Sequence, residues 1–271
     1  MCYSDYADIV TKEEFRNVYQ KIKESLIQGR MLNEDPNEDK CTIILGGQPG
    51  SGKSRFYKMR EDLTNYIAIN GDEYRIFHPN HDNIIKYDLE NYAERTQSFC
   101  NKITEALISE LGNKGYNLII EGTLRNPEVP VKTCEYLKGR GYNPDLMVVA
   151  CDAEKSWCST ITRAKILKEQ GLVPRLVPID IYNSTVNRIA DNLTWIENKK
   201  CFDNITIFDR DGVVLYPNEK NEKASDILRR ELNLSNWNNK YQEYSEQFIR
   251  EKILLLQSSL DKERLNNEHI K

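Results

Sequence analysis

Eight residues near the start of the chain have the types and the spacing that phosphate binding requires. They follow the pattern G-x-x-x-x-G-K-[ST] and read Gly47, Gln48, Pro49, Gly50, Ser51, Gly52, Lys53 and Ser54. Glycines let the backbone curl so that several N–H groups point at one anion. In such a loop Lys53 reaches the β- and γ-phosphates of a nucleotide, and the Ser54 hydroxyl ligates Mg²⁺. The loop predicts a site for ATP with Mg²⁺, and no base-reading motif excludes GTP.

The flanking residues decide whether this pattern is a phosphate site or a glycine-rich turn with a chance lysine. An apolar, β-branched segment, residues 41–45, precedes the loop and predicts a strand. A helical segment follows from residue 53. A helix start adds partial positive charge beside the anion. The order of strand, loop and helix favours the phosphate site over the turn.

Two carboxylates follow the next predicted strands, Tyr66–Ile69 and Asn117–Ile120. Asp72 comes shortly after the first strand, and Glu121 directly after the second. Ligands bind parallel sheets at the carboxyl ends of the strands, so both acids should share the rim that carries the loop. One of them could hold Mg²⁺ while the other accepts a proton from an attacking hydroxyl. That pairing indicates transfer to a second substrate.

A basic stretch, residues 163–175, stands out in a mildly acidic chain. Its predicted helix ends near Gly171, and a loop through Pro174 leads to Arg175. Such a lid would bring Arg163 and Arg175 to the phosphates, where guanidinium groups stabilise the charge of the transferred phosphoryl group. Solvated surface charge is the alternative, and spacing alone does not decide between the two.

The elements that must position these residues alternate between strands and helices. Further strands are predicted at 145–150 and 205–208, and helices near 53–63, 84–113, 129–139, 153–169 and 179–197. This alternation predicts an α/β fold of the P-loop NTPase kind, with a mainly parallel sheet covered by helices on both faces. Asp211-Gly212 signals a hairpin at the sheet edge.

The two ends of the chain are predicted to be helical. Thr11 and Glu14 form a capping box for a helix that ends at Gly29, and a polar loop with Pro36 leads into the first strand. The sequence divides into a kinase domain, 1–220, and a helical extension, 221–271. Apolar residues recur through the extension at Tyr241, Tyr244, Phe248, Ile253, Leu256 and Leu260. We expect it to pack on the main domain, with a partner-binding helix as the alternative.

Composition limits the kinds of partner. The 271 residues carry a net charge of -4, which argues against general affinity for nucleic acid or anionic membranes. No apolar run could span a bilayer, and the N-terminus does not read as a signal peptide. The seven cysteines form no Cys-x-x-Cys pair, and the three histidines lack metal-ligand spacing. A cytoplasmic protein with reduced thiols is expected.

The chain resembles the zeta toxins, the kinase half of epsilon/zeta-type toxin–antitoxin pairs, over residues 11–216. The matching segments are Leu45–Ser54, Gly71–Arg75 with His78 and Pro79, Thr104–Ser109 running into Gly115–Arg125, and Val129–Pro130 with Thr133. The run from Gly115 to Thr123 is more specific to the family than the phosphate loop. The departures are Asn70, where the family often has an acid, one residue fewer between the two arginines, and an unmatched tail beyond residue 222.

This resemblance implies a kinase that transfers the γ-phosphate of ATP to the 3′-hydroxyl of UDP-N-acetylglucosamine and so blocks peptidoglycan synthesis. It makes Asp72 the general base and places Lys53 and Ser54 on the nucleotide phosphates and Mg²⁺. Glu121 would lie near the metal and the sugar, and Arg163 and Arg175 would clamp the phosphates. The resemblance also assigns contacts with the sugar nucleotide, to Glu105, Thr123, Arg125 and Thr133. A small helical antitoxin is the implied protein partner.

Two other functions remain open at this point. The same loop and acids would serve a kinase for another acceptor, such as a different sugar nucleotide, an antibiotic or a nucleic-acid end. The loop alone would also serve a nucleotide-dependent binding module without transfer. The acidic net charge weighs against the nucleic-acid end, because phosphate-rich partners favour a basic surface.

Overall fold

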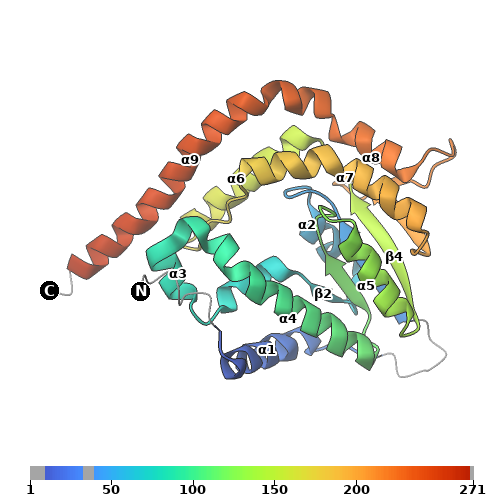
Figure 1. The fold of residues 1–271 in the computed structure, drawn as a ribbon, viewed down its shortest axis with the longest axis horizontal. Coiled ribbons are helices and arrows are strands. Elements are labelled where there is room, and N and C mark those ends of the chain that lie inside the picture. The colour runs from blue at the N-terminus through green and yellow to red at the C-terminus, as the bar shows by residue number, and fades with distance from the viewer. Residues whose placement is uncertain (1–9, 33–39, 269–271) are drawn as a thin grey trace.

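A computed structural model describes residues 10–32 and 40–268, with side chains described as far as residue 256. The predicted loop at Pro36, the first nine residues and His269 lie outside the described residues. The described chain forms a central sheet surrounded by helices (Figure 1). Among the described residues, none of the helices is both long and apolar enough to cross a membrane.

The sheet has six strands in the order β2-β3-β1-β4-β5-β6. All neighbours are parallel except β5 and β6, which pair antiparallel through the predicted hairpin. In chain order, the strands are β1 Lys40–Gly46, β2 Ile67–Ile69, β3 Leu118–Glu121, β4 Tyr142–Val149, β5 Asn204–Phe208 and β6 Val214–Tyr216. The prediction of a mainly parallel α/β sheet is confirmed.

Helices cover both faces of the sheet because the central strand is apolar on both sides. Ile43 and Leu45 pack with Phe56 on one face, while Ile44 packs with residues of α5 to α9 on the other, as the two-residue period of a strand requires. The helices are α1 Lys12–Ile27, α2 Lys53–Lys58, α3 His81–Asp88, α4 Tyr92–Lys114, α5 Glu128–Lys138, α6 Ala153–Glu169, α7 Ile179–Lys199, α8 Ala224–Leu232 and α9 Leu234–Glu268.

The long helix predicted at 84–113 is broken. It consists of α3, the 3₁₀ turn η4 Leu89–Asn91, and α4. At the break the Asp88 carboxylate accepts bonds from Asn91 Nδ2 at 2.8 Å and Arg95 Nε at 2.8 Å. Asp and Asn side chains compete with the helical hydrogen bonds of the backbone, which accounts for the interruption. The helix predicted at 53–63 likewise stops at Lys58 and continues as the 3₁₀ turn η2 Glu61–Leu63.

The C-terminal helix α9 packs along α6 and α7 (Figure 1). Its Trp237 is 0% exposed and lies in a cluster of aromatic rings. The ring centroids of Trp237 lie 6.0 Å from Trp157 and 5.0 Å from Tyr182, and the Trp237 Nε1–H donates to Asn183 Oδ1 at 2.9 Å. Phe248 adds a further ring to Trp157 at 5.5 Å. A division of the chain at residue 220 remains a prediction.

The burial of Trp237 makes a stability prediction. Trp237→Ala should lower the free energy of unfolding by about 3–5 kcal/mol, because it leaves a cavity among packed rings. Denaturant unfolding, monitored by circular dichroism, would measure this loss of unfolding free energy, and we expect a single transition. Trp195→Ala is the control, since Trp195 is 37% exposed and carries Lys199 Nζ 4.5 Å from its ring centroid, and it should cost about 1 kcal/mol or less. A separate, early transition for α9 in the wild-type protein would contradict the single cooperative unit.

Candidate functional site

The loop Gly47–Ser54 turns tightly between β1 and α2 at the carboxyl end of the sheet. Three of its glycines have positive φ, 144° at Gly47, 77° at Gly50 and 103° at Gly52. At Gly50 a Cβ would lie only 2.1 Å from the backbone oxygen of Ser156 in α6. The loop therefore rests directly on the first turns of α6, and only glycine fits at that contact.

Gln48 fixes the loop from the inside. Its side chain is fully buried, and its Nε2 donates to Cys151 O at 2.6 Å and to Ser156 Oγ at 3.2 Å. These bonds join the loop to the segment between β4 and α6. Gln48, at the first x position of the pattern, thus holds the loop in place.

The residues of the loop fit a phosphate group. The Ser51 hydroxyl is buried and has no hydrogen-bond partner among the described residues. Lys53 is 7% exposed, and its Nζ donates back to Gly47 O at 2.8 Å and Gln48 O at 3.1 Å. Burial lowers the pKa of Lys53, and the nearby Glu121 carboxylate opposes that shift. An anion in the loop would accept from both side chains and favour the charged lysine.

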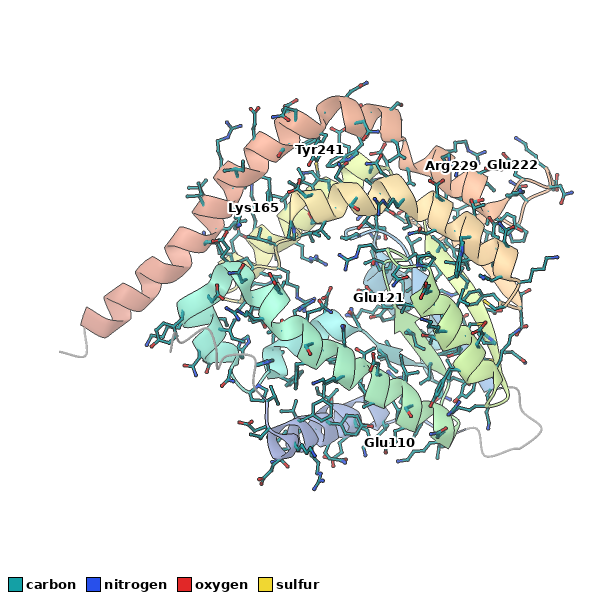
Figure 2. The ribbon with its side chains drawn as sticks, viewed as in Figure 1. Glu110, Glu121, Lys165, Glu222, Arg229 and Tyr241 are labelled. Carbon is teal, nitrogen blue, oxygen red and sulfur yellow. The ribbon has the colours of Figure 1, made fainter. Side chains whose placement is uncertain are left out.

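Glu121, at the end of β3, connects the first turn of α2 with the end of β2 through one carboxylate oxygen. Ser54 Oγ donates to Glu121 Oε2 at 2.9 Å, and Asn70 Nδ2 donates to the same oxygen at 3.2 Å. Figure 2 labels Glu121 near the centre of the view, at the end of β3. A serine hydroxyl and a carboxylate are oxygen ligands of the kind Mg²⁺ prefers. In the described part of the chain no group of three His, Cys, Asp or Glu could hold a metal, so further ligands would come from substrate phosphates or water.

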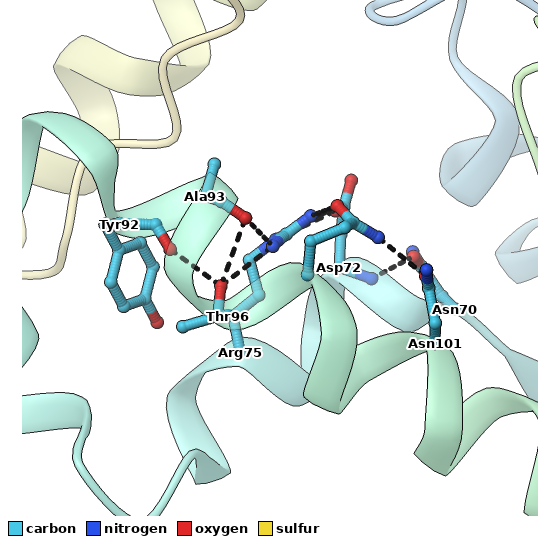
Figure 3. Close-up of polar contacts among 8 residues, drawn as sticks. Asn70, Asp72, Arg75, Tyr92, Ala93, Thr96 and Asn101 are labelled. Atoms are coloured by element: carbon cyan, nitrogen blue, oxygen red, sulfur yellow. Dashed lines mark hydrogen bonds and ion pairs between the residues drawn. The ribbon is translucent and has the colours of Figure 1, made fainter. Parts of the chain in front are cut away.

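Asp72 lies on the 3₁₀ segment η3 Gly71–Phe77, directly after β2. Its Oδ1 accepts from Arg75 Nε at 3.0 Å and from Arg75 Nη2 at 2.7 Å (Figure 3). Its side chain remains 56% exposed, compared with 10% for Arg75. Among the described residues the other carboxylate oxygen, Oδ2, accepts no hydrogen bond, so it is available to a substrate hydroxyl.

Arg75 is itself held by α4. Its Nη1 donates to Ala93 O at 2.6 Å and Thr96 Oγ1 at 2.8 Å, and its Nη2 also donates to Gln97 Oε1 at 2.7 Å (Figure 3). These bonds satisfy the outward side of the guanidinium and leave the other side for Asp72. Arg75 therefore fixes the position of the Asp72 carboxylate relative to α4.

The charges around Asp72 keep it ionised. Burial within the site raises the pKa of Asp72, but Arg75, and more weakly Arg175 and Arg163, outweigh it, so the pKa lies below its usual value of 3.8. A base with a lowered pKa is deprotonated throughout the neutral range. Such a carboxylate is in the ionisation state that a proton acceptor requires.

The two predicted arginines reach the same site from α6 and the segment after it. Removal from bulk water lowers the pKa of Arg163, and the positive charge of Arg175 lowers it further, whereas Asp72 and Glu121 oppose the shift. Two like charges held near each other repel, and an anion between them would relieve that repulsion. The structure thus brings together Lys53, Ser54, Asp72, Glu121, Arg163 and Arg175.

The other predicted site residues lie farther out. Thr123 and Arg125 are exposed on the turn after β3, and Glu105 is exposed on α4. Thr133 lies on α5 and donates its hydroxyl to Val129 O at 2.9 Å. Among the described residues these four make no hydrogen bond to Asp72 or Glu121, and their roles stay predictions.

The turn that presents Thr123 and Arg125 is built by its neighbours. Leu124 has a φ of 54° and packs its side chain directly over Gly46, where a Cβ would lie 2.4 Å from Leu124 Cδ1. Asn192 Nδ2, from α7, donates to Leu124 O at 2.9 Å and Arg125 O at 3.0 Å. Asn192 is not among the residues predicted above, because no local pattern links position 192 to position 125.

Arg75 is likewise not among the predicted site residues. A signal for it does exist in the sequence, since residues three apart in a 3₁₀ turn lie on one side, which places Arg75 over Asp72. The hydrophobic periodicity predicted no helical turn at 71–77. Without that turn, the three-residue spacing could not indicate that Arg75 contacts Asp72.

Comparison with known proteins gives a consistent result. A sequence model described as zeta toxin matches residues 23–221. Toxin zeta of Streptococcus pyogenes is 33% identical over 228 residues, which cover 82% of this chain and 78% of that protein. Toxin PezT of Streptococcus pneumoniae is 33% identical over 240 residues, covering 86% and 90%.

Solved structures agree with the sequence comparison. A structure from the PezAT chromosomal toxin–antitoxin system of Streptococcus pneumoniae has a TM-score of 0.74 at 29% identity, covering 90% of this chain and 98% of that one. A complex of AvrRxo1-ORF1 and ORF2 with ATP has a TM-score of 0.54 at 12% identity, covering 75% of this chain and 66% of that one. The second likeness concerns the fold alone.

The contact at Gly50 makes a prediction about the loop. Gly50→Ala should destabilise the protein and weaken nucleotide binding, because the new Cβ meets the Ser156 backbone oxygen. Gly141→Ala is the matched control, since Gly141 has a similar φ of 79° but no atom within 4 Å of its Cβ position. Both variants bear the cost of a left-handed alanine, about 1–2 kcal/mol. Gly50→Ala should lose about 1–3 kcal/mol more of the free energy of unfolding than Gly141→Ala, and this difference measures the clash with Ser156. Equal losses in the two variants would refute the clash.

Proposed function

Since this chain belongs to the zeta toxin family, we propose that it is an ATP-dependent kinase that phosphorylates the 3′-hydroxyl of the amino sugar in UDP-N-acetylglucosamine. It would act as the toxin of a toxin–antitoxin pair that blocks peptidoglycan synthesis in the cytoplasm. The family membership rests on the match to residues 23–221 and on relatives 33% identical over most of the chain.

One observation supports a transferase over a simple nucleotide-binding module. Two carboxylates from neighbouring strand ends have different surroundings beside the same loop. Glu121 is bonded to Ser54, whereas Asp72 is bonded to Arg75 and keeps a free oxygen. The first arrangement suits a metal ligand and the second a proton acceptor. A binding module needs no proton acceptor, while a kinase does.

In the proposed reaction Asp72 Oδ2 accepts the proton of the acceptor hydroxyl. The hydroxyl oxygen forms the new bond to the γ-phosphorus, the bond from that phosphorus to the β–γ bridging oxygen breaks, and ADP leaves. Lys53 neutralises charge on the donor phosphates, and Arg163 and Arg175 stabilise the charge spread over the transferred group. Asn70 and Ser54 hold Glu121 in position.

Mg²⁺ would be held by Ser54 and Glu121, and when bound it supplies charge neutralisation between the β- and γ-phosphates. Glu105, Thr123, Arg125 and Thr133 are the proposed contacts of the sugar nucleotide. Glu105, Thr123 and Arg125 are exposed and Thr133 is half-buried, which leaves all four accessible to a second substrate. GTP is the alternative donor.

The proposed protein partner is a small helical antitoxin that contacts the loop face and excludes ATP. Support comes from the solved neighbour, which belongs to a toxin–antitoxin system. Displacement of bound ATP by a purified antitoxin would test this; simultaneous tight binding of both would argue against it.

The substrate proposal is tested by incubating the protein with γ-labelled ATP, Mg²⁺ and a panel of acceptors. The panel should contain UDP-N-acetylglucosamine, other UDP-sugars, an aminoglycoside antibiotic and 5′-hydroxyl RNA. Label on the 3′-position of UDP-N-acetylglucosamine is expected. Label on another acceptor would identify that molecule as the substrate in place of UDP-N-acetylglucosamine. Binding of ATP without any label transfer would favour the nucleotide-dependent binding module.

Asp72→Asn should retain ATP binding and lose transfer by about 10²–10⁴-fold, because a placed base contributes about that much to the rate. Initial rates of label transfer and a separate measurement of ATP affinity give the two quantities. Asp82→Asn, an exposed acid on the neighbouring α3, is the control and should leave both unchanged. A near-normal rate in Asp72→Asn would remove Asp72 from the role of base.

Arg75→Gln should shift the acidic limb of the kcat/KM–pH profile to higher pH. The wild-type pKa of Asp72 is lowered chiefly by Arg75 against the effect of burial, so removing the cation raises it and the ionised base is lost sooner as pH falls. Arg75→Lys keeps the charge and should shift the limb less. An identical limb in Arg75→Gln, with only a uniform loss of rate, would assign Arg75 a purely structural role.

A further inference from the structure

Arg175 lies in a segment that no backbone hydrogen bond holds. Helix α6 is closed by Gly171, which has a φ of 75° and donates its N–H to Lys168 O at 2.9 Å, as a glycine cap does. Among the described residues, no backbone-to-backbone hydrogen bond involves residues 173–177, and α7 begins at Ile179. Packing of side chains must therefore set where the Arg175 guanidinium lies.

Apolar contacts attach this segment to both sides of the site. The two apolar residues that follow Arg175 pack against the core shared by α6 and α7. On the other side of the arginine, Val173 packs against a small cluster formed by Ile84 of α3 and Tyr92, the first residue of α4. Figure 1 shows α3 and α4 apart from α6 and α7. The contact of Val173 thus links the segment after α6 to the helices that face it.

The cluster that receives Val173 belongs to the support of the base. Tyr92 O accepts from Thr96 Oγ1 at 2.8 Å, one turn along α4 (Figure 3). The Thr96 hydroxyl oxygen in turn accepts from Nη1 of Arg75, which orients Asp72, at 2.8 Å. Val173 therefore docks on the turn of α4 that fixes the proposed base.

Charge alone does not bring Arg175 to this turn. Burial raises the pKa of Tyr92, and the positive charges of Arg75 and Arg175 oppose that rise, so both cations act on the same ring. Like charges repel, and Arg75 already pairs with Asp72 at 2.7 Å. Little net attraction is left to draw Arg175 toward α4, whereas the apolar contact next to it supplies one.

We propose that Val173 is a positioning residue for phosphoryl transfer, which docks on Ile84 and Tyr92 and so holds Arg175 at a set distance from Asp72. Pro174 joins Val173 to Arg175, and its ring restricts the backbone, so the contact is transmitted along the chain. The inference rests on the proposed kinase function, but on no particular acceptor. Without the contact, the phosphate loop would still bind the donor, and the transferred group would lose a stabilising charge.

Val173→Asn tests this contact, because it places an amide against an apolar cluster. It should lower kcat by about 10- to 100-fold, since a misplacement of about 1 Å costs that much, and leave KM for ATP unaltered. Val173→Ile keeps the apolar contact and should retain the wild-type kcat. Leu172→Asn is the matched control, since the Leu172 side chain is 56% exposed, and both kinetic constants should stay unchanged.

A double-mutant cycle shows whether Val173 acts through Arg175. In an Arg175→Ala protein, Val173→Asn should cost no further rate, because the group that it positions is gone. Independent, additive losses would overturn the proposal. So would a Val173→Asn protein with the kcat of Leu172→Asn.

Limited trypsin cleavage at the Arg175–Leu176 bond tests the docking without any activity. Mass spectrometry should find faster cleavage in Val173→Asn than in Leu172→Asn, because an undocked segment enters the protease more often. Equal cleavage rates would overturn the docking. The proposed function fails separately, if the wild-type protein labels no acceptor; the cleavage rates then still decide whether Val173 docks the segment.

Discussion

The site depends on one carboxylate oxygen, Glu121 Oε2, which accepts from Ser54 and Asn70 at once. Glu121 ends β3, Asn70 follows β2 and Ser54 lies in the first turn of α2, so the two bonds join the phosphate-loop helix to two neighbouring strand ends where the chemistry would occur. Asn70 serves twice, because its Oδ1 also accepts from the Asp72 backbone N–H at 3.1 Å. The Asn70 amide therefore connects Glu121, the proposed metal ligand, to the segment that carries Asp72, the proposed base. An acid at position 70 would repel Glu121, and the amide avoids that repulsion without metal.

The charge balance of the site follows from this arrangement. Lys53, Arg75, Arg163 and Arg175 surround two carboxylates, which leaves two more cations than anions in a chain whose net charge is -4. This excess of positive charge is local, because α6 and η3 bring the arginines close to the phosphate loop. Arg75 is neutralised by Asp72, but the mutual effect of Arg163 and Arg175 is unfavourable without an anion. The protein thus maintains a small region whose charge suits phosphates, although the rest of its surface would repel a polyanion.

Much of this site could be predicted because its main parts are local in sequence. The loop pattern, its strand and its helix lie within nineteen residues, from Lys40 to Lys58, and Asp72 and Glu121 come at or shortly after the ends of apolar segments that read as strands. The residues that orient them are not local. Arg75 required a 3₁₀ turn that periodicity does not reveal, and Asn192 reaches the turn after β3 from α7. The helix α8 lies within the predicted helical extension, 221–271, but its bounds could not be predicted, because it is short and its first N–H groups are held by Glu197 of α7.

The helix α9 has the least family resemblance, yet it spans the two sides of the site. Lys165 and Lys168 of α6 bond to Glu251 and to Leu254 O, and Lys252 pairs with Glu90 beside α4. Exposed ion pairs of this kind contribute little energy, about 1 kcal/mol or less each. The burial of Trp237, Phe248 and Leu255 must therefore hold the helix, while the ion pairs set its register. Packing of α9 along α6 therefore supports the helix that carries Arg163, while the Lys252–Glu90 ion pair links α9 to η4, the turn that leads into the helix holding Arg75.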